Sequence, residues 1–136
     1  NINVIYIYIE MSRHYSAYME VTFKQQHSYR DRCDESSRIL SKFPYRVPVV
    51  CEKHMSPHRH TPTLDKKKYL VPRELTMGQF VYVIRKRMKL PPEEAIFLCI
   101  GSTISPSGAY IGNMYDQYGD VDGFLYITYT TENTFG

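Results

Sequence analysis

Three cysteines are the most reactive side chains in this chain of 136 residues. Cys33, Cys51 and Cys99 are widely spaced and form no CxxC pair. Their number is odd, so neither a disulfide framework nor a thiolate zinc site is predicted. Free thiols of this kind are typical of a reducing, cytosolic setting.

The histidines and the common catalytic residue types show no spacing that predicts a site. His54, His58 and His60 lie near one another, but no Cys or carboxylate accompanies them at ligand spacing. No Ser-His-Asp, Cys-His or paired-carboxylate arrangement can be read along the chain, although a triad can also form in the fold. We therefore expect a protein that is not an enzyme, with no metal and no cofactor.

Charge is distributed unevenly along the chain. All 17 Lys and Arg precede Leu90, together with eight acids, so this part carries a net charge of +9. Six acids and no Lys or Arg follow, which gives −6. An acidic partner for the first part and mutual attraction between the two parts are equally physical explanations.

The basic runs also allow an alternative function as a nucleic-acid-binding domain. The runs at 66–68 and 85–89 have tyrosines nearby that could stack on bases. A basic run is more often a solvated surface, and no other sequence feature supports this alternative. A steep loss of oligonucleotide binding with salt would favour it.

Membrane attachment would have to come from chemistry or from partners. No stretch approaches the roughly 20 apolar residues of a membrane span. The apolar run at residues 5–9 is too short even for a secretory signal.

The N-terminal region predicts an extension followed by helices. Residues 1–18 are rich in Tyr and Ile and show no helical period, so we expect a tail or an added strand. Asp34 in N-cap position and Pro44 enclose an amphipathic pattern that predicts a helix over 34–43. Residues 22–28 are a possible further helix.

Two strands are expected next. The β-branched run at 47–51 predicts the first strand of a sheet. After a polar loop, the segment KKKYLV at 66–71 predicts a second strand, ended by Pro72 and rich in Lys as sheet edges often are.

The segment LTMGQF carries the strongest local signal. Thr76 and Gln79 form a capping box, and Leu75 and Phe80 a hydrophobic staple, so a helix is expected from here to the prolines at 91 and 92. Its apolar face is expected to comprise Phe80, Val83, Ile84 and Met88. A strand at 96–100, a short helix near 108–115 and a strand at 124–130 complete an α+β sheet with helices on one face.

Three long motifs carry a family resemblance. The segments SRILSKFPYRVPVV, LDKKKYLVPRELTMGQFVYVIRKRMKL and FLYITYTTENTFG resemble those of the autophagy ubiquitin-like modifiers of GABARAP type, over about residues 19–136. The resemblance implies a β-grasp (ubiquitin-like) fold, with a four-stranded mixed sheet and two additional N-terminal helices. It divides the chain into an extension at 1–18, a modifier domain at 19–130 and a flexible conjugation tail at 131–136.

The family's chemistry would act on the C-terminus. The resemblance implies that Gly136 becomes joined to phosphatidylethanolamine by E1-like, E2-like and E3-like enzymes. A processing and deconjugating cysteine protease is a further partner that the resemblance implies. Glycine offers no side chain to obstruct enzyme channels, and the two acyl chains of the lipid suffice for stable anchoring. The protein would then be cytoplasmic, and on the autophagosome membrane when lipidated.

The family's second activity is peptide binding at the edge strand. By resemblance, autophagy receptors and adaptors would place a W/F/Y-x-x-L/I/V motif along the edge, and no nucleic acid is expected as a partner. The pocket for the aromatic residue would be lined by Glu35, Ile39, Pro48, Val50, Lys68, Leu70 and Phe124. The pocket for the aliphatic residue would be lined by Tyr69, Val71, Pro72, Leu75, Phe80 and Val83. Acids flanking the motif would meet Arg46, Lys66, Lys68 and Arg87.

Taken alone, most of these apolar residues would be assigned to a plain core. The residues 6–9 and 18–21 themselves match the motif, which suggests that the extension could occupy a groove of its own chain or of a neighbour. Such short matches also recur by chance.

Overall fold

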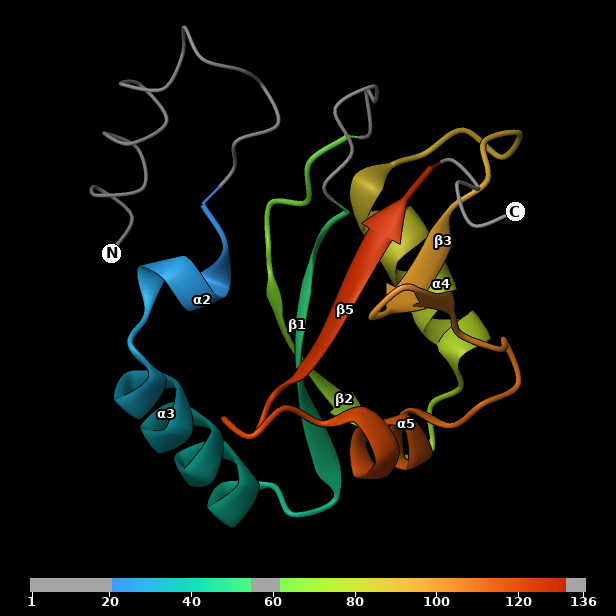
Figure 1. Cartoon of the computed structure of the whole chain (residues 1–136). Helices are drawn as coiled ribbons and strands as arrows, with labels where there is room; N and C mark the ends of the chain where they lie inside the picture. Colours follow the sequence, from blue (N-terminus) through green and yellow to red (C-terminus); the bar gives the residue numbers. More distant parts are fainter. Residues whose placement is uncertain (1–20, 55–61, 132–136) are drawn as a thin grey trace, which may run out of the picture.

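The computed structural model describes residues 21–54 and 62–131, and Figure 1 shows their arrangement. The extension at 1–18, the two histidines at 58 and 60, and Gly136 lie outside the described residues.

From residue 21 onward, two helices precede the sheet, and both begin at a capped residue. Helix α2 (Phe23–Gln26) starts with a capping box formed by Thr22 and Gln25. Helix α3 (Tyr29–Lys42) starts where the Ser28 hydroxyl accepts a hydrogen bond from the Asp31 N–H at 3.1 Å. The predicted N-cap at Asp34 is therefore wrong: Ser28, six residues earlier, is the N-cap, and Asp34 lies within the helix.

Strands β1 (Arg46–Lys53) and β2 (Lys68–Pro72) form an antiparallel pair. Strand β5 (Leu125–Thr130) lies parallel to β1, and β3 (Phe97–Ile100) lies antiparallel to β5. A two-residue strand, β4 (Thr103–Ile104), was not predicted and adds a fifth member, so the order is β2-β1-β5-β3-β4. The sheet is mixed, as expected, and β2 forms one of its edges.

Two helices follow the hairpin. Helix α4 (Met77–Met88) has both hydrogen bonds of the predicted capping box between Thr76 and Gln79. It ends before the prolines, because Lys89 takes a left-handed conformation with φ of 55°. Helix α5 (Ile111–Tyr118) begins and ends three residues later than predicted.

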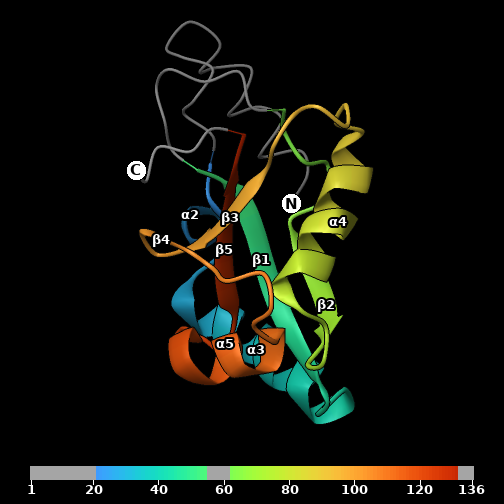
Figure 2. The ribbon, with the colours of Figure 1, turned by 90° about the vertical axis from the view of Figure 1, so that its right-hand side faces the viewer.

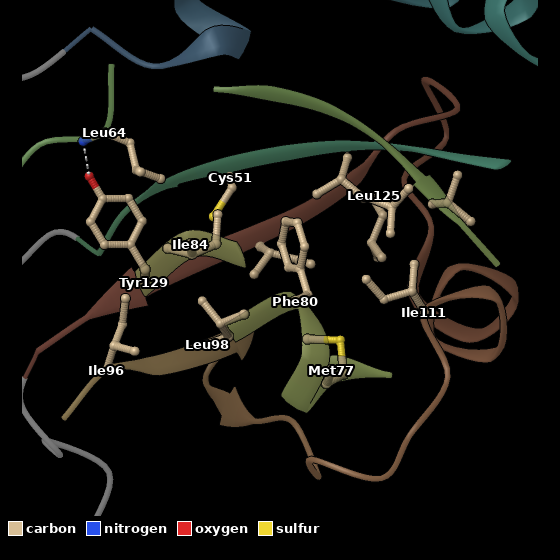
Figure 3. Packing of buried hydrophobic residues seen from close by; sticks show 14 residues of the cluster. Cys51, Leu64, Met77, Phe80, Ile84, Ile96, Leu98, Ile111, Leu125 and Tyr129 are labelled. Atoms are coloured by element: carbon tan, nitrogen blue, oxygen red, sulfur yellow. Dashed lines mark hydrogen bonds between the residues drawn. The ribbon is translucent and has the colours of Figure 1, made fainter. Parts of the chain in front are cut away.

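The sheet is covered on both faces, which corrects the prediction of helices on one face. In Figure 2, α4 and α2 lie on opposite sides of the sheet. The larger core packs α4 against odd-numbered residues of β1 and β5, as Figure 3 shows. A smaller core on the other face joins Phe23 to Val50 and Phe124. Because strand side chains alternate, β1 and β5 serve both cores.

Candidate functional site

The open edge of β2 follows from the hydrogen-bond register of the hairpin. The N–H of Cys51 donates to the carbonyl of Lys67 at 2.8 Å, and the N–H of Arg73 to that of Tyr45 at 3.2 Å. In an antiparallel pair such bonds recur at every second residue, so the odd-numbered residues of β2 bond to β1. The backbone groups of Lys68 and Leu70 therefore point out of the sheet.

The side chains of β2 are shared between the two faces of the sheet. Lys68 turns toward α3, where its Nζ lies 2.6 Å from Glu35 Oε1. Tyr69 turns toward α4, and its ring lies edge-on to Phe80 with 5.5 Å between centroids. One strand thus contributes to two apolar surfaces on opposite sides, with the open edge between them.

Residues assigned to the first pocket all lie on the α3 face or at its border. Pro48, Val50 and Phe124 are fully buried, so they can form only a floor. Phe23, which is 2% exposed, covers this floor with its ring 5.2 Å from that of Phe124. Sequence reasoning missed Phe23; the capping box at Thr22 was the available signal, because it makes Phe23 the first residue of a helix.

The residues assigned to the second pocket, for the aliphatic residue, are divided between the core and the surface. Val71 and Phe80 are buried, whereas Val83 is 40% exposed, so the predicted apolar face of α4 is broken at Val83. Leu75 and Val83 line a hollow of about 570 Å³ over the first turns of α4. The sequence did not predict its other lining residues, which are Thr76, Gly78, Gln79, Tyr82, Ser107 and Gly108.

The predicted acid-binding residues already have contacts within the chain. Arg87 pairs with Asp65 at 3.0 Å, and the Lys66 ammonium lies 5.5 Å from the centroid of the Tyr69 ring. Arg46 makes a long contact of 3.4 Å with the Leu70 carbonyl at the open edge. An acidic ligand would have to compete with these contacts.

Mutual attraction explains part of the charge asymmetry. Three acids of the C-terminal part pair with bases of the N-terminal part, at 2.6 to 2.8 Å: Asp116 with Arg73, Asp120 with Lys24, and Asp122 with Arg32. Bases such as Lys66 and Arg46 remain exposed near β2, so an acidic partner for the first part of the chain stays a prediction.

Asp122 is the centre of a buried polar network that fixes α3 to the sheet. Its carboxylate accepts hydrogen bonds from Arg32 Nη1 at 2.8 Å and from the Tyr126 hydroxyl, and its carbonyl accepts from Ser36 Oγ. Burial, followed by the hydrogen bond to Asp122, raises the pKa of Tyr126. The network positions the helix that carries Glu35 and Ile39.

Strand β5 is held firmly by the rest of the fold near its C-terminal end. The Tyr129 side chain is 1% exposed, and its hydroxyl accepts a hydrogen bond from the Leu64 N–H at 2.9 Å (Figure 3). The His54 N–H donates to the Tyr129 carbonyl at 2.8 Å. The chain is thus fixed as far as the last residues of the strand.

Reactive and metal-binding groups do not gather elsewhere in the described part of the chain. Burial raises the pKa of both Cys51 and Cys99, which makes these thiols poor nucleophiles. Within residues 21–54 and 62–131, no group of three or more His, Cys, Asp or Glu is placed to hold a metal ion. None of the helices in those ranges is long and apolar enough to cross a bilayer.

A mixed sheet crossed by α4, with parallel central strands β1 and β5, defines a ubiquitin-like protein, here extended by α2 and α3. The family described as autophagy protein Atg8, ubiquitin-like, matches residues 31–136. The chain is 51% identical to autophagy-related protein 8 of Saccharomyces cerevisiae over 118 residues, which cover 87% of this chain and 99% of the yeast protein. This chain belongs to the Atg8 family of autophagy ubiquitin-like proteins.

Two solved structures agree with this assignment. The crystal structure of Trypanosoma brucei ATG8 is 40% identical, with a TM-score of 0.77, and the match covers 84% of this chain and 97% of that one. Plasmodium falciparum Atg8, solved in complex with a peptide of Plasmodium falciparum Atg3, is 30% identical, with a TM-score of 0.74, over 82% of this chain and 97% of that one.

Proposed function

We propose that this protein is an autophagy modifier that becomes linked through Gly136 to phosphatidylethanolamine and recruits partners that carry aromatic-x-x-aliphatic motifs. The observation that carries the peptide-binding half is the open β2 edge, where outward backbone groups at Lys68 and Leu70 lie between two apolar surfaces. An extended peptide would add a strand here and direct alternate side chains to the two faces.

The direction of the bound peptide follows from the two surfaces. Lys68 and Glu35 mark the first surface near the start of β2, whereas Pro72 and Leu75 lie at its end. The aromatic residue precedes the aliphatic residue in the motif, so the peptide would run parallel to β2. Receptors and adaptors of autophagy are the partners proposed for this edge.

The conjugation half rests on family membership and on the position of β5. The strand is fixed up to Tyr129, and Gly136 follows seven residues later in the sequence. E1-like, E2-like and E3-like enzymes, and a trimming and releasing cysteine protease, are the proposed partners. The complex of Plasmodium falciparum Atg8 with an Atg3 peptide supports such contacts in the family.

Reconstituted conjugation tests this half of the proposal. The chain would be incubated with the family's conjugation enzymes, ATP and liposomes that contain phosphatidylethanolamine, and lipid-linked product would be detected by its gel shift and mass. Wild type and Gly108→Ala, a change at an exposed internal glycine, should both be modified. Gly136→Ala should not be, and equal modification of all three would refute Gly136 as the attachment point.

Peptide titration tests the binding half. A fluorescent peptide with a Trp-x-x-Leu core should bind the wild type and lose affinity when its Trp is replaced by Ala. Leu70→Asp would place a carboxylate at the centre of the edge and should weaken binding. If replacing the Trp does not change the affinity for the peptide, and an oligonucleotide binds with a steep dependence on salt, the nucleic-acid alternative would be favoured instead.

A further inference from the structure

The described part of the chain begins beside the start of the open edge strand. The Lys67 ammonium donates a hydrogen bond to the Val21 carbonyl at 2.7 Å and lies 3.3 Å from Glu52 Oε2. The same Glu52 oxygen accepts a hydrogen bond from the Phe23 N–H at 2.7 Å. These part-buried contacts, which we call the clamp, hold Val21 next to Lys67, one residue before β2 begins (Figure 1). The extension therefore joins the fold at the end of the edge where a parallel peptide would begin.

The edge of β2 offers a place for one more strand. Among residues 21–54 and 62–131, β2 pairs only with β1, and its other side carries the outward backbone groups of Lys68 and Leu70. From Lys67 to Pro72 an extended chain covers about 16 Å. A parallel ligand of the proposed motif would place its aromatic residue near Lys68 and its aliphatic residue at the far end of this distance.

The clamp excludes one of the two motif matches in the extension. In the segment 18–21 the aliphatic residue is Val21 itself. A peptide parallel to β2 would need this residue near Pro72, about 16 Å from Lys67. Val21 is held at Lys67 instead. The segment 18–21 therefore cannot fill the groove of its own chain.

The other match, at residues 6–9, can reach the groove. It lies outside the described residues and reads YIYI, an alternation of aromatic and β-branched residues that favours an extended strand. The residues 10–20 join Ile9 to Val21 and can span at most about 40 Å, more than twice the length of the edge. Much of this linker is polar, as a loop that returns over the surface requires.

Tethering makes even a weak match effective. A flexible linker of this length has an r.m.s. end-to-end distance of roughly 20 Å, which is close to the length of the edge. The tethered segment therefore has an effective concentration on the order of 1 mM at the groove. If the segment alone binds with a dissociation constant of about 0.2 mM, an external ligand would bind about sixfold more weakly than it does to an open groove.

We propose that residues 6–9 occupy the β2 groove of their own chain as a displaceable strand parallel to β2, with Tyr6 on the first apolar surface and Ile9 on the second. Partners bind by displacing this strand. This inference rests on the proposed peptide-binding function and adds a threshold to it, because a motif that binds more weakly than the tethered segment displaces little of it.

Variants in the extension test the proposal without changing the folded core. The fluorescent Trp-x-x-Leu peptide would be titrated against the full chain and against the double variant Tyr6→Ser, Ile9→Ser. The double variant should bind the peptide about three- to tenfold more tightly. The matched control, Met11→Ser with Tyr15→Ser, removes an apolar and an aromatic side chain from the linker and should leave the affinity unchanged.

Removal of residues 10–17 distinguishes the groove of the same chain from that of a neighbour. The change keeps residues 6–9 but leaves only about 13 Å of extended chain between Ile9 and Val21, too little to span the edge and turn back. This variant should gain affinity for the Trp-x-x-Leu peptide as the double variant does. If it keeps the wild-type affinity, the proposal is wrong, and a sedimentation mass of two chains would assign the extension to a neighbour's groove.

Amide hydrogen exchange gives a readout that needs no external peptide. An added strand would accept hydrogen bonds from the outward N–H groups of Lys68 and Leu70. These amides should exchange about tenfold more slowly in the wild type than in the double variant. The Tyr69 amide, which faces β1, should exchange equally in both and serves as the internal reference.

The outcomes distinguish this inference from the function on which it rests. If a chain without residues 1–18 fails to bind the Trp-x-x-Leu peptide, the proposed function is refuted. If that chain, the wild type and the double variant bind the peptide with equal affinity, only the occupation of the groove by the extension is overturned. Equal exchange of the Leu70 amide in the wild type and the double variant would overturn it as well.

Discussion

Lys68 and Glu35 form an ion pair of 2.6 Å between Nζ and Oε1, which joins the open edge strand to helix α3. Their side chains are 50% and 24% exposed, so solvent screens the attraction and the pair adds little to stability. Its position matters more, because the pair crosses the border of the first predicted pocket. Lys68 therefore has an internal partner that competes with acids of an incoming peptide.

Glu35→Gln should free Lys68 for an acidic ligand. We expect about two- to fivefold tighter binding of a motif peptide with acids before its aromatic residue, and a change in the free energy of unfolding below about 1 kcal/mol. Peptide anisotropy and urea titration measure the two effects. Glu93→Gln makes the same charge change at an exposed position after α4; an equal gain in that variant would mean that net charge, and not the pair, controls affinity.

Asp122→Asn should destabilise the fold strongly. The Asp122 side chain is fully buried and that of Arg32 is 11% exposed, so the change leaves a nearly buried guanidinium without its counter-charge. We expect the free energy of unfolding, measured with urea, to fall by about 3 kcal/mol. Asp116→Asn, which breaks a pair whose acid is 59% exposed, should cost less than about 1 kcal/mol. Similar losses in both variants would contradict the role assigned to the buried network.

Gly123→Ala should also destabilise the fold, because Gly123 has φ of +93° and lies against α3. An added Cβ would clash with Ser36 Oγ, which is held by the Asp122 carbonyl. We expect the free energy of unfolding, measured by heat or urea, to fall by about 2 kcal/mol or more. Gly108→Ala is the matched control, since a Cβ there meets nothing within 4 Å and the φ is not positive. A neutral Gly123→Ala would show that α3 can shift without cost.

Alkaline pH should weaken the fold through Tyr69. Burial raises the pKa of Tyr69 to about 12 from an ordinary value of 10.0, so the folded state holds this proton more tightly than the unfolded state. Its stabilising effect is present below pH 10 and is lost as the pH rises from about 10 toward 12.

Tyr69→Phe isolates this effect from the other titrating groups. At pH 8 the variant should be less stable by about 1 kcal/mol, because it lacks the hydrogen bond from the hydroxyl to the Lys66 carbonyl. The difference between wild type and variant in the free energy of unfolding should become smaller between pH 10 and 11.5, as measured by urea unfolding. A difference that stays constant over this range would show that Tyr69 does not titrate with the fold.

Local sequence signals predicted most elements and some of their boundaries. The capping box at Thr76 and Gln79 is present as expected, because its hydrogen bonds join residues three apart and need no distant partner. The start of α3 was misplaced, since Asp and Ser cap helices about equally well and the sequence alone did not rank Ser28 above Asp34. Strand β4 was missed, because two residues are too few to form a pattern.

The proposed binding residues could be named from the sequence only through the family motifs. Alternation along KKKYLV predicted that Lys68 and Tyr69 would face opposite sides, and the structure places them so. The cover that Phe23 forms over Phe124 could not be predicted, because it joins residues about a hundred positions apart. The hollow between the start of β1, the end of β2 and the start of α5 could not be predicted either, since its lining comes from three separate segments.

The sequence by itself determined the local elements, the alternation of the edge strand and the family, because propensity, capping and motif order are properties of neighbouring residues. Tertiary structure decided which bases remain exposed. Arg32, Lys24 and Arg73 pair with acids of the C-terminal part, whereas Arg46 stays on the surface at the end of β2. The reason is physical: an ion pair depends on distance in space, and only the fold brings charges this far apart in the chain within a few ångströms.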